Sequence, residues 1–64
     1  MNDLKELLIQ FQHVYICGPF SYKHVARYMN CSKEKALAVI SYGFDNNFIG
    51  NGRYGCYFKR GLIK

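Results

Sequence analysis

Apolar residues recur every three or four positions near the start of the chain, which is the spacing of one face of an α-helix. These positions are Leu4, Leu7, Leu8 and Phe11. Asp3 and Glu6 stand at the spacing of a capping box, in which side chains satisfy the free backbone amides at a helix start. The pattern predicts a helix over about residues 4–13 with one apolar face.

Residues 14–17, Val-Tyr-Ile-Cys, form a short apolar run of residues that favour strands, and Gly18-Pro19 ends it. A run this short is too small for an independent element. We therefore predict a small strand that pairs with a hairpin later in the chain.

The middle of the chain predicts two helices joined by a tight turn, over residues 22–29 and 33–45. Ser21 and Ser32 are residue types favoured before a first helical turn, and Asn30 tolerates the left-handed conformation that ends a helix. The short connection forces the two helices to cross steeply. The side chains expected to face the core are Val25, Ala26, Met29, Ala36, Ile40, Gly43 and Phe44, with Leu37 and Val39 at the edges of the face on the second helix.

The outward face of the second of these helices is mixed in charge and size. Its expected members are Glu34, Lys35, Ala38, Ser41, Tyr42 and Asp45. Gly43 lowers helix stability by about 1 kcal/mol relative to Ala. A glycine at this position predicts either a close approach of another segment or an early end of the helix.

The strongest local signal is Asn51-Gly52, the preferred pair for a two-residue type I′ turn between antiparallel strands. It predicts a hairpin over about residues 47–59 in which Ile49 faces Tyr54. Alternation along the returning strand then directs one set of side chains to the core, namely Tyr54, Cys56 and Phe58. The other set faces solvent or a ligand and comprises Arg53, Tyr57 and Lys59.

The charge of the chain is concentrated in its second part. With 64 residues, half of them hydrophobic, the sequence predicts one small packed domain. The net charge is +5; residues 18–64 carry eight Lys and Arg side chains against two carboxylates, whereas residues 1–17 carry one against two. This asymmetry favours a polyanionic partner, and ordinary solubilising charge is the alternative.

The cysteines and histidines do not form a catalytic or metal-binding pattern. Cys17, Cys31 and Cys56 are odd in number and lack Cys-x-x-Cys spacing, so we expect core thiols in a reducing cytoplasm. Their spacing to His13 and His24 matches no zinc site, and neither histidine has a carboxylate at a spacing useful for catalysis. We expect no metal, no cofactor and no enzymatic activity. The acidic N-terminus and the lack of an apolar run of about 18 residues predict neither export nor a membrane span.

The order of the predicted elements resembles the winged helix-turn-helix family, an α+β and mostly helical fold of three helices, a short strand and a C-terminal β-hairpin wing. The residues that carry the resemblance are Val25-Ala26, Met29-Asn30-Cys31-Ser32, Ala36, Ile40, Asn46-Asn47-Phe48-Ile49 and Gly52-Arg53-Tyr54. The resemblance covers roughly residues 3–59 and implies a single winged-helix domain over residues 1–64. The chain departs from the family pattern at Asn30, where Gly is frequent, and at Gly43.

Members of this family that bind DNA place the third helix in the major groove and the wing on the backbone or in the minor groove. The resemblance thus implies a small double-stranded DNA-binding protein, sequence-dependent or architectural, that regulates transcription. The residues expected to contact DNA are Lys23, Arg27, Ser32, Lys33, Lys35, Ala38, Ser41, Tyr42, Arg53, Lys59 and Arg60. A single copy gives a small footprint, so we expect a homodimer or a partner protein to assist.

A second interpretation is a winged-helix protein-interaction module, such as an accessory subunit or an inhibitor of host machinery. The six tyrosines favour it, because Tyr is enriched at protein interfaces. The alternative for the tyrosines is that their amphipathic rings cover a small core. Small basic proteins of this kind are frequent in viruses and mobile elements, which by analogy gives a location in the cytoplasm of the cell or of the host.

Overall fold

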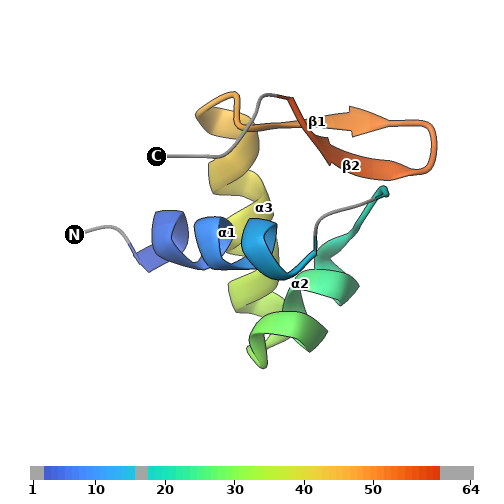
Figure 1. The fold of residues 1–64 in the computed structure, drawn as a ribbon. Coiled ribbons are helices and arrows are strands. Elements are labelled where there is room, and N and C mark those ends of the chain that lie inside the picture. Colours follow the sequence, from blue (N-terminus) through green and yellow to red (C-terminus); the bar gives the residue numbers. More distant parts are fainter. Residues whose placement is uncertain (1–2, 16–17, 60–64) are drawn as a thin grey trace.

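Three helices and one two-stranded antiparallel hairpin make up an α+β, mostly helical fold (Figure 1). The computed structural model describes residues 3–15 and 18–59. The elements are α1 (Asp3–Val14), α2 (Tyr22–Met29), α3 (Lys33–Asp45), β1 (Ile49–Gly52) and β2 (Gly55–Phe58). Helices α2 and α3 have the bounds that the sequence predicts, and α1 extends one residue further at each end.

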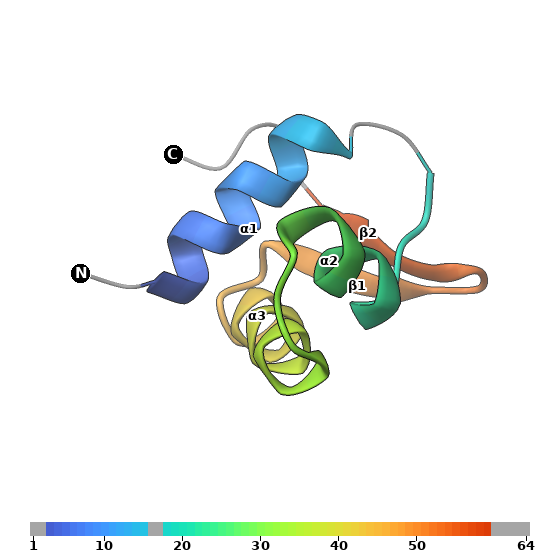
Figure 2. The ribbon, with the colours of Figure 1, turned by 90° about the horizontal axis from the view of Figure 1, so that it is seen from below.

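The core lies where α1, α2 and the hairpin meet α3. Helices α1 and α2 both pack against α3, and β1 lies at its C-terminal end (Figures 1 and 2). The largest fully buried side chains are Phe11, Phe20, Leu8, Ile49, Val25 and Val39. The rings of Phe11 and Phe20 meet edge to face, with centroids 5.0 Å apart, so α1 and the segment before α2 share one aromatic centre. Within the described part of the chain, no helix has the length and apolar composition needed to cross a membrane.

Local hydrogen bonds fix the turn between α2 and α3, as the capping residues predict. Asn30 adopts the left-handed conformation, with φ 53° and ψ 49°. The Ser32 hydroxyl oxygen accepts a hydrogen bond from the backbone N–H of Lys35 at 3.1 Å. At the start of α2, the backbone N–H of Ser21 donates to Nδ1 of His24 at 3.1 Å, so a histidine takes the place that Glu has in a capping box.

The strand predicted over residues 14–17 is wrong for the residues that the structure describes. Val14 is the last residue of α1, and the N–H of Tyr15 still donates to the carbonyl of Phe11 at 2.8 Å. The other two residues of that run, 16 and 17, lie outside the described part of the chain. The partner of the hairpin is instead Phe20, which exchanges two backbone hydrogen bonds with Cys56, of 3.0 and 2.7 Å.

The close approach of Phe20 explains why residue 55 is a glycine. Gly55 has a φ of +135°, which side chains rarely allow, and a Cβ there would lie 2.8 Å from the carbonyl oxygen of Phe20. Gly55 thus allows the segment before α2 to lie beside β2.

The register predicted for the hairpin is also wrong. The strands pair Ile49 with Phe58 and Gly52 with Gly55, so the two-residue loop is Arg53-Tyr54 rather than Asn51-Gly52. Neither residue of the Asn-Gly pair has the positive φ that a type I′ turn requires. The observed register pairs Ile49 with Phe58, whose ring packs near those of Phe11 and Phe20, whereas the predicted register pairs Ile49 with Tyr54. Packing in this aromatic cluster, together with the pairing of Cys56 and Phe20, outweighs the turn preference.

The change of register alters which side chains the hairpin buries. Cys56 is buried and Phe58 is half-buried, as predicted for the core side, and Tyr57 and Lys59 are exposed, as predicted for the other side. Tyr54, which was expected to face the core, is 80% exposed because it stands in the loop. The hairpin therefore presents two tyrosine rings to solvent.

The buried face of α3 is rotated from the predicted one. Ala36, Ile40 and Gly43 are buried as expected. Val39, predicted at one edge of this face, is fully buried, whereas Phe44 is 39% exposed and Leu37, predicted at an edge, is 43% exposed. The physical reason lies at Gly43, where an added Cβ would lie 2.8 Å from Cγ1 of Ile49. The close approach predicted at this glycine is confirmed, and the helix continues to Asp45 rather than ending early.

Candidate nucleic-acid interface

The outward face of α3 offers few groups that read base edges. Of the residues predicted to read bases, Ser41 is exposed, whereas Ala38 and Tyr42 are half-buried. The ring of Tyr42 packs near that of Phe48, with centroids 6.1 Å apart, so it belongs partly to the exit from the helix. The exposed residues on this helix are Lys33, Glu34, Leu37, Ser41, Phe44 and Asp45. This face therefore presents two acids and two large apolar side chains to a partner.

The residues predicted at the N-terminus of α3 are largely engaged within the protein. Ser32 is exposed and caps the helix through its hydroxyl oxygen. The ammonium nitrogen of Lys33 lies 5.6 Å from the centroid of the Tyr22 ring, at the range of a cation–π contact. Lys35 is half-buried. The Lys33 side chain is thus held near Tyr22 at the start of the helix, and the residue remains exposed to solvent.

The remaining predicted contacts fall on α2 and on the hairpin. Lys23 and Arg27 are exposed and stand four positions apart, which places them on one face of α2. Arg53 is exposed in the hairpin loop, and Lys59 is exposed just after β2. Arg60, the last predicted contact, lies outside the described residues. The structure therefore gives two pairs of exposed cations, one on α2 and one on the hairpin.

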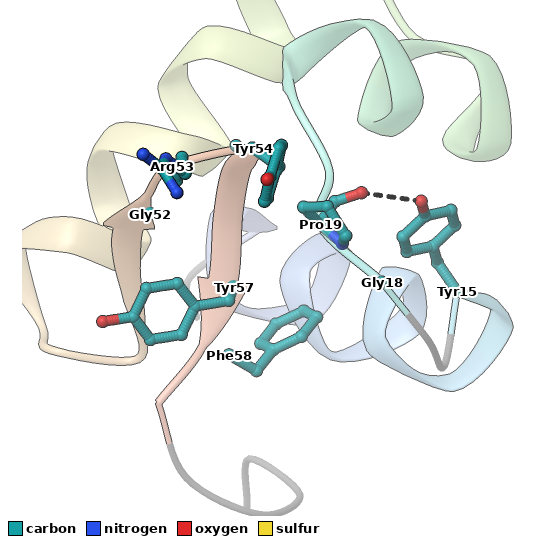
Figure 3. A pocket seen from close by; sticks show the side chains of 9 residues that line it. Tyr15, Gly18, Pro19, Gly52, Arg53, Tyr54, Tyr57 and Phe58 are labelled. Atoms are coloured by element: carbon teal, nitrogen blue, oxygen red, sulfur yellow. Dashed lines mark hydrogen bonds between the residues drawn. The ribbon is translucent and has the colours of Figure 1, made fainter.

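A groove is lined by residues that lie far apart in the sequence and come together only in the folded protein. It lies between the segment before α2 and the hairpin, and it has a volume of about 460 Å³ (Figure 3). Its lining consists of Tyr15, Gly18, Pro19, Gly52, Arg53, Tyr54, Gly55, Tyr57 and Phe58. The six tyrosines of the sequence indicate an aromatic surface of this kind. The predicted register, however, directs Tyr54 to the core, so it does not predict this groove.

The wall of the groove on the α1 side is held by several contacts. The Tyr15 hydroxyl donates a hydrogen bond to the carbonyl oxygen of Pro19 at 2.8 Å (Figure 3). The Tyr15 ring also stacks on Phe11, with centroids 5.2 Å apart and planes 10° apart, and meets the rings of His24 and Tyr28 at the same centroid distance. These contacts fix the ring of Tyr15 before any ligand binds.

The electrostatics of the groove favour an anion. Arg53 is the one charged side chain among the described residues that line it, and none of these residues is acidic. The chemistry of the groove is thus aromatic and cationic. Elsewhere, burial raises the pKa of the Cys56 thiol, which favours the protonated form, and both Cys31 and Cys56 are free thiols. Among the described residues, no group of His, Cys, Asp or Glu side chains could hold a metal ion.

Comparison of the chain with protein-family models, with curated protein sequences and with solved structures gave no significant match.

Proposed function

We propose that the chain is a winged helix-turn-helix domain that binds double-stranded DNA mainly through its phosphates. The order of three helices followed by an antiparallel hairpin supports the fold, with α2 and α3 as the helix-turn-helix and the hairpin as the wing. The observation that carries the function is the exposed Arg53 in the loop of the hairpin. An arginine at the tip of a wing suits a narrow minor groove or a phosphate.

The exposed cations of α2, Lys23 and Arg27, supply further phosphate contacts that are independent of base sequence. The acids and apolar side chains on α3 disfavour strong base reading, because specific contacts usually come from Arg, Lys, Asn or Gln at that position. We therefore propose an architectural or weakly sequence-dependent protein, with a role in regulating transcription.

A titration of duplex DNA at two salt concentrations tests this proposal. Each phosphate contact contributes a slope of about −0.9 to the dependence of log K on log salt, so affinity should fall steeply as salt rises. Arg53→Ala should reduce the magnitude of that slope by about 0.9, which is the contribution of one phosphate contact. Two controls separate position from charge: Arg53→Lys keeps the charge, and Lys5→Gln removes one charge from α1. Binding that is undetectable or independent of salt would contradict the proposal.

A second candidate, a protein-interaction module, is favoured by the exposed apolar side chains of α3. Leu37 is 43% exposed and Phe44 is 39% exposed. They stand two helical turns apart, on the same side of the helix. A homodimer through this face would give a mass above 7.5 kDa by light scattering, and a Leu37→Ser, Phe44→Ser double variant would return it to the monomer. A partner protein would instead be captured by the wild type after nuclease treatment and lost with the same variant.

A further inference from the structure

The hairpin carries aromatic surface that neither the core nor duplex binding uses. Tyr54 is 80% exposed and Tyr57 is 46% exposed, so most of the Tyr54 ring contributes nothing to the core. We propose that the hairpin and its groove bind an unpaired nucleic-acid strand, whose bases stack on these two rings and whose phosphates contact Arg53. This site shares Arg53 with the proposed duplex contacts but not the cations of α2, and it rests on the proposed nucleic-acid function, which it extends to unpaired strands.

The ring of Tyr57 lies over Gly50 and Gly52, the two residues of β1 without side chains. Tyr57 pairs with Gly50, and a Cβ on Gly50 would lie 2.8 Å from both Cζ and the hydroxyl oxygen of Tyr57. A Cβ on Gly52 would lie 3.1 Å from Cδ1 of the same ring. The ring therefore lies along the two glycines, with one side against the backbone, and its remaining exposure leaves a surface for a flat partner.

Tyr54 lies on the other side of β2, beside the groove. Figure 3 shows its ring on the side of the groove opposite Pro19, with Phe58 and Tyr15 further along the lining. A volume of about 460 Å³ is within the usual range for sites that hold small ligands. Aromatic rings that bind single strands stack on the bases irrespective of sequence, since every base has a flat face.

The charge of the lining selects this occupant over a proline-rich peptide, which is the other ligand that aromatic grooves bind. Bases alternate with phosphates along a strand, and the lining of the groove includes both Tyr54 and Arg53, consecutive residues of the hairpin loop, with no acidic side chain among its described residues. A proline-rich segment brings no negative charge for this guanidinium. The net charge of +5 favours the polyanion in the same direction.

The test compares two oligonucleotides that have the same phosphates and differ only in their bases. Fluorescein-labelled (dT)12 and an abasic strand of equal length are titrated by fluorescence anisotropy, and (rU)12 in parallel distinguishes DNA from RNA. Because the chain has no Trp but six tyrosines, the part of the tyrosine fluorescence quenching that is lost in Tyr54→Leu and Tyr57→Leu reports stacking on these two rings. We expect (dT)12 or (rU)12 to bind on the order of tenfold or more tightly than the abasic strand.

Single substitutions distinguish the contribution of the two tyrosine rings to binding from an effect on folding. Tyr54→Leu and Tyr57→Leu should each weaken binding to the base-containing strand on the order of ten- to hundredfold, and Tyr54→Phe should retain it. Gly50→Ala retains every ring and charge but adds a Cβ 2.8 Å from the end of the Tyr57 ring and 3.1 Å from Cε of Lys59, so it displaces the ring and should weaken binding as well. Phe44→Leu, which removes an exposed ring from α3, is the matched control and should bind like the wild type.

Circular dichroism of each variant shows whether it is folded; Tyr54 is exposed enough for its loss to leave the fold intact. Equal affinity for the abasic strand, or unchanged binding by folded Tyr54→Leu and Tyr57→Leu, would overturn the inference. Tighter binding of a proline-rich peptide that depends on the same tyrosines would also overturn it. Loss of duplex binding with intact single-strand binding would refute the proposed duplex function alone, and the reverse result would refute this inference alone.

Discussion

Replacing Gly43 by alanine sets two effects of opposite sign against each other. Alanine in the middle of a helix is about 1 kcal/mol more favourable than glycine, so helix propensity predicts a more stable protein. The structure predicts the opposite, because the added Cβ would lie 2.8 and 2.9 Å from Cγ1 and Cδ1 of Ile49 and 3.3 Å from Cδ2 of Leu8. Carbon atoms in favourable contact are about 3.5–4.0 Å apart.

Neither neighbour can move into solvent to make room. Ile49 is 1% exposed and Leu8 is 0% exposed, so the methyl group must be accommodated by strained rotamers or by separating α3 from the hairpin. Overpacking of this kind typically costs about 1–3 kcal/mol. After the gain in propensity is subtracted, Gly43→Ala should lower the free energy of unfolding by about 1 kcal/mol. For a domain of this size that corresponds to a fall in Tm of about 4–8 °C.

Urea unfolding monitored by circular dichroism measures this change, with two variants as controls. Ser41→Ala places alanine at an exposed position of the same helix, so it should stabilise by a few tenths of a kcal/mol through propensity alone. Ile49→Val removes Cδ1, one of the two close atoms, so Gly43→Ala should cost less in that background than in the wild type. A stabilising Gly43→Ala, or an equal cost in both backgrounds, would refute the packing argument.

Two further predictions concern single residues whose environment the structure defines. Asn30 has φ 53° and ψ 49°, in the left-handed region, so Asn30→Ala should destabilise the protein by about 1 kcal/mol. Asn30→Gly should instead be neutral or stabilising, because glycine adopts this conformation without strain. Thermal unfolding of both variants measures the difference, and equal Tm values would contradict the prediction. Burial raises the pKa of the Cys56 thiol from its ordinary value of 9.0, so the folded state holds this proton more tightly than the unfolded chain and the stability contribution is fully present below pH 9.0. The free energy of unfolding should therefore fall as pH rises through the raised pKa, and Cys56→Ala should show a shallower fall in urea titrations on both sides of pH 9.0.

The outward surface was predicted less completely than the helices. The place of Arg53 in the predicted hairpin indicates a candidate contact, and its side chain is exposed there. The predicted register places Tyr54 in the returning strand on the core side, whereas the observed pairing of Gly52 with Gly55 leaves Tyr54 in the loop, where it is exposed. The groove could not be found from the sequence, since Tyr15, Pro19 and Tyr57 meet only after α1 and the hairpin have packed on α3.

The sequence by itself determined the positions of the three helices, because their signals are local. Apolar spacing, the caps at Ser21 and Ser32, and the left-handed Asn30 each act within a few residues of chain. Only the tertiary structure decided the register of the hairpin. Fully burying a large apolar side chain contributes about 1.5–3 kcal/mol. The packing of Phe58 near Phe11 and Phe20, together with the pairing of Phe20 and Cys56, outweighs the local preference of Asn51-Gly52 for a tight turn. The same register places Tyr54 in the loop at the tip of the hairpin rather than in the core.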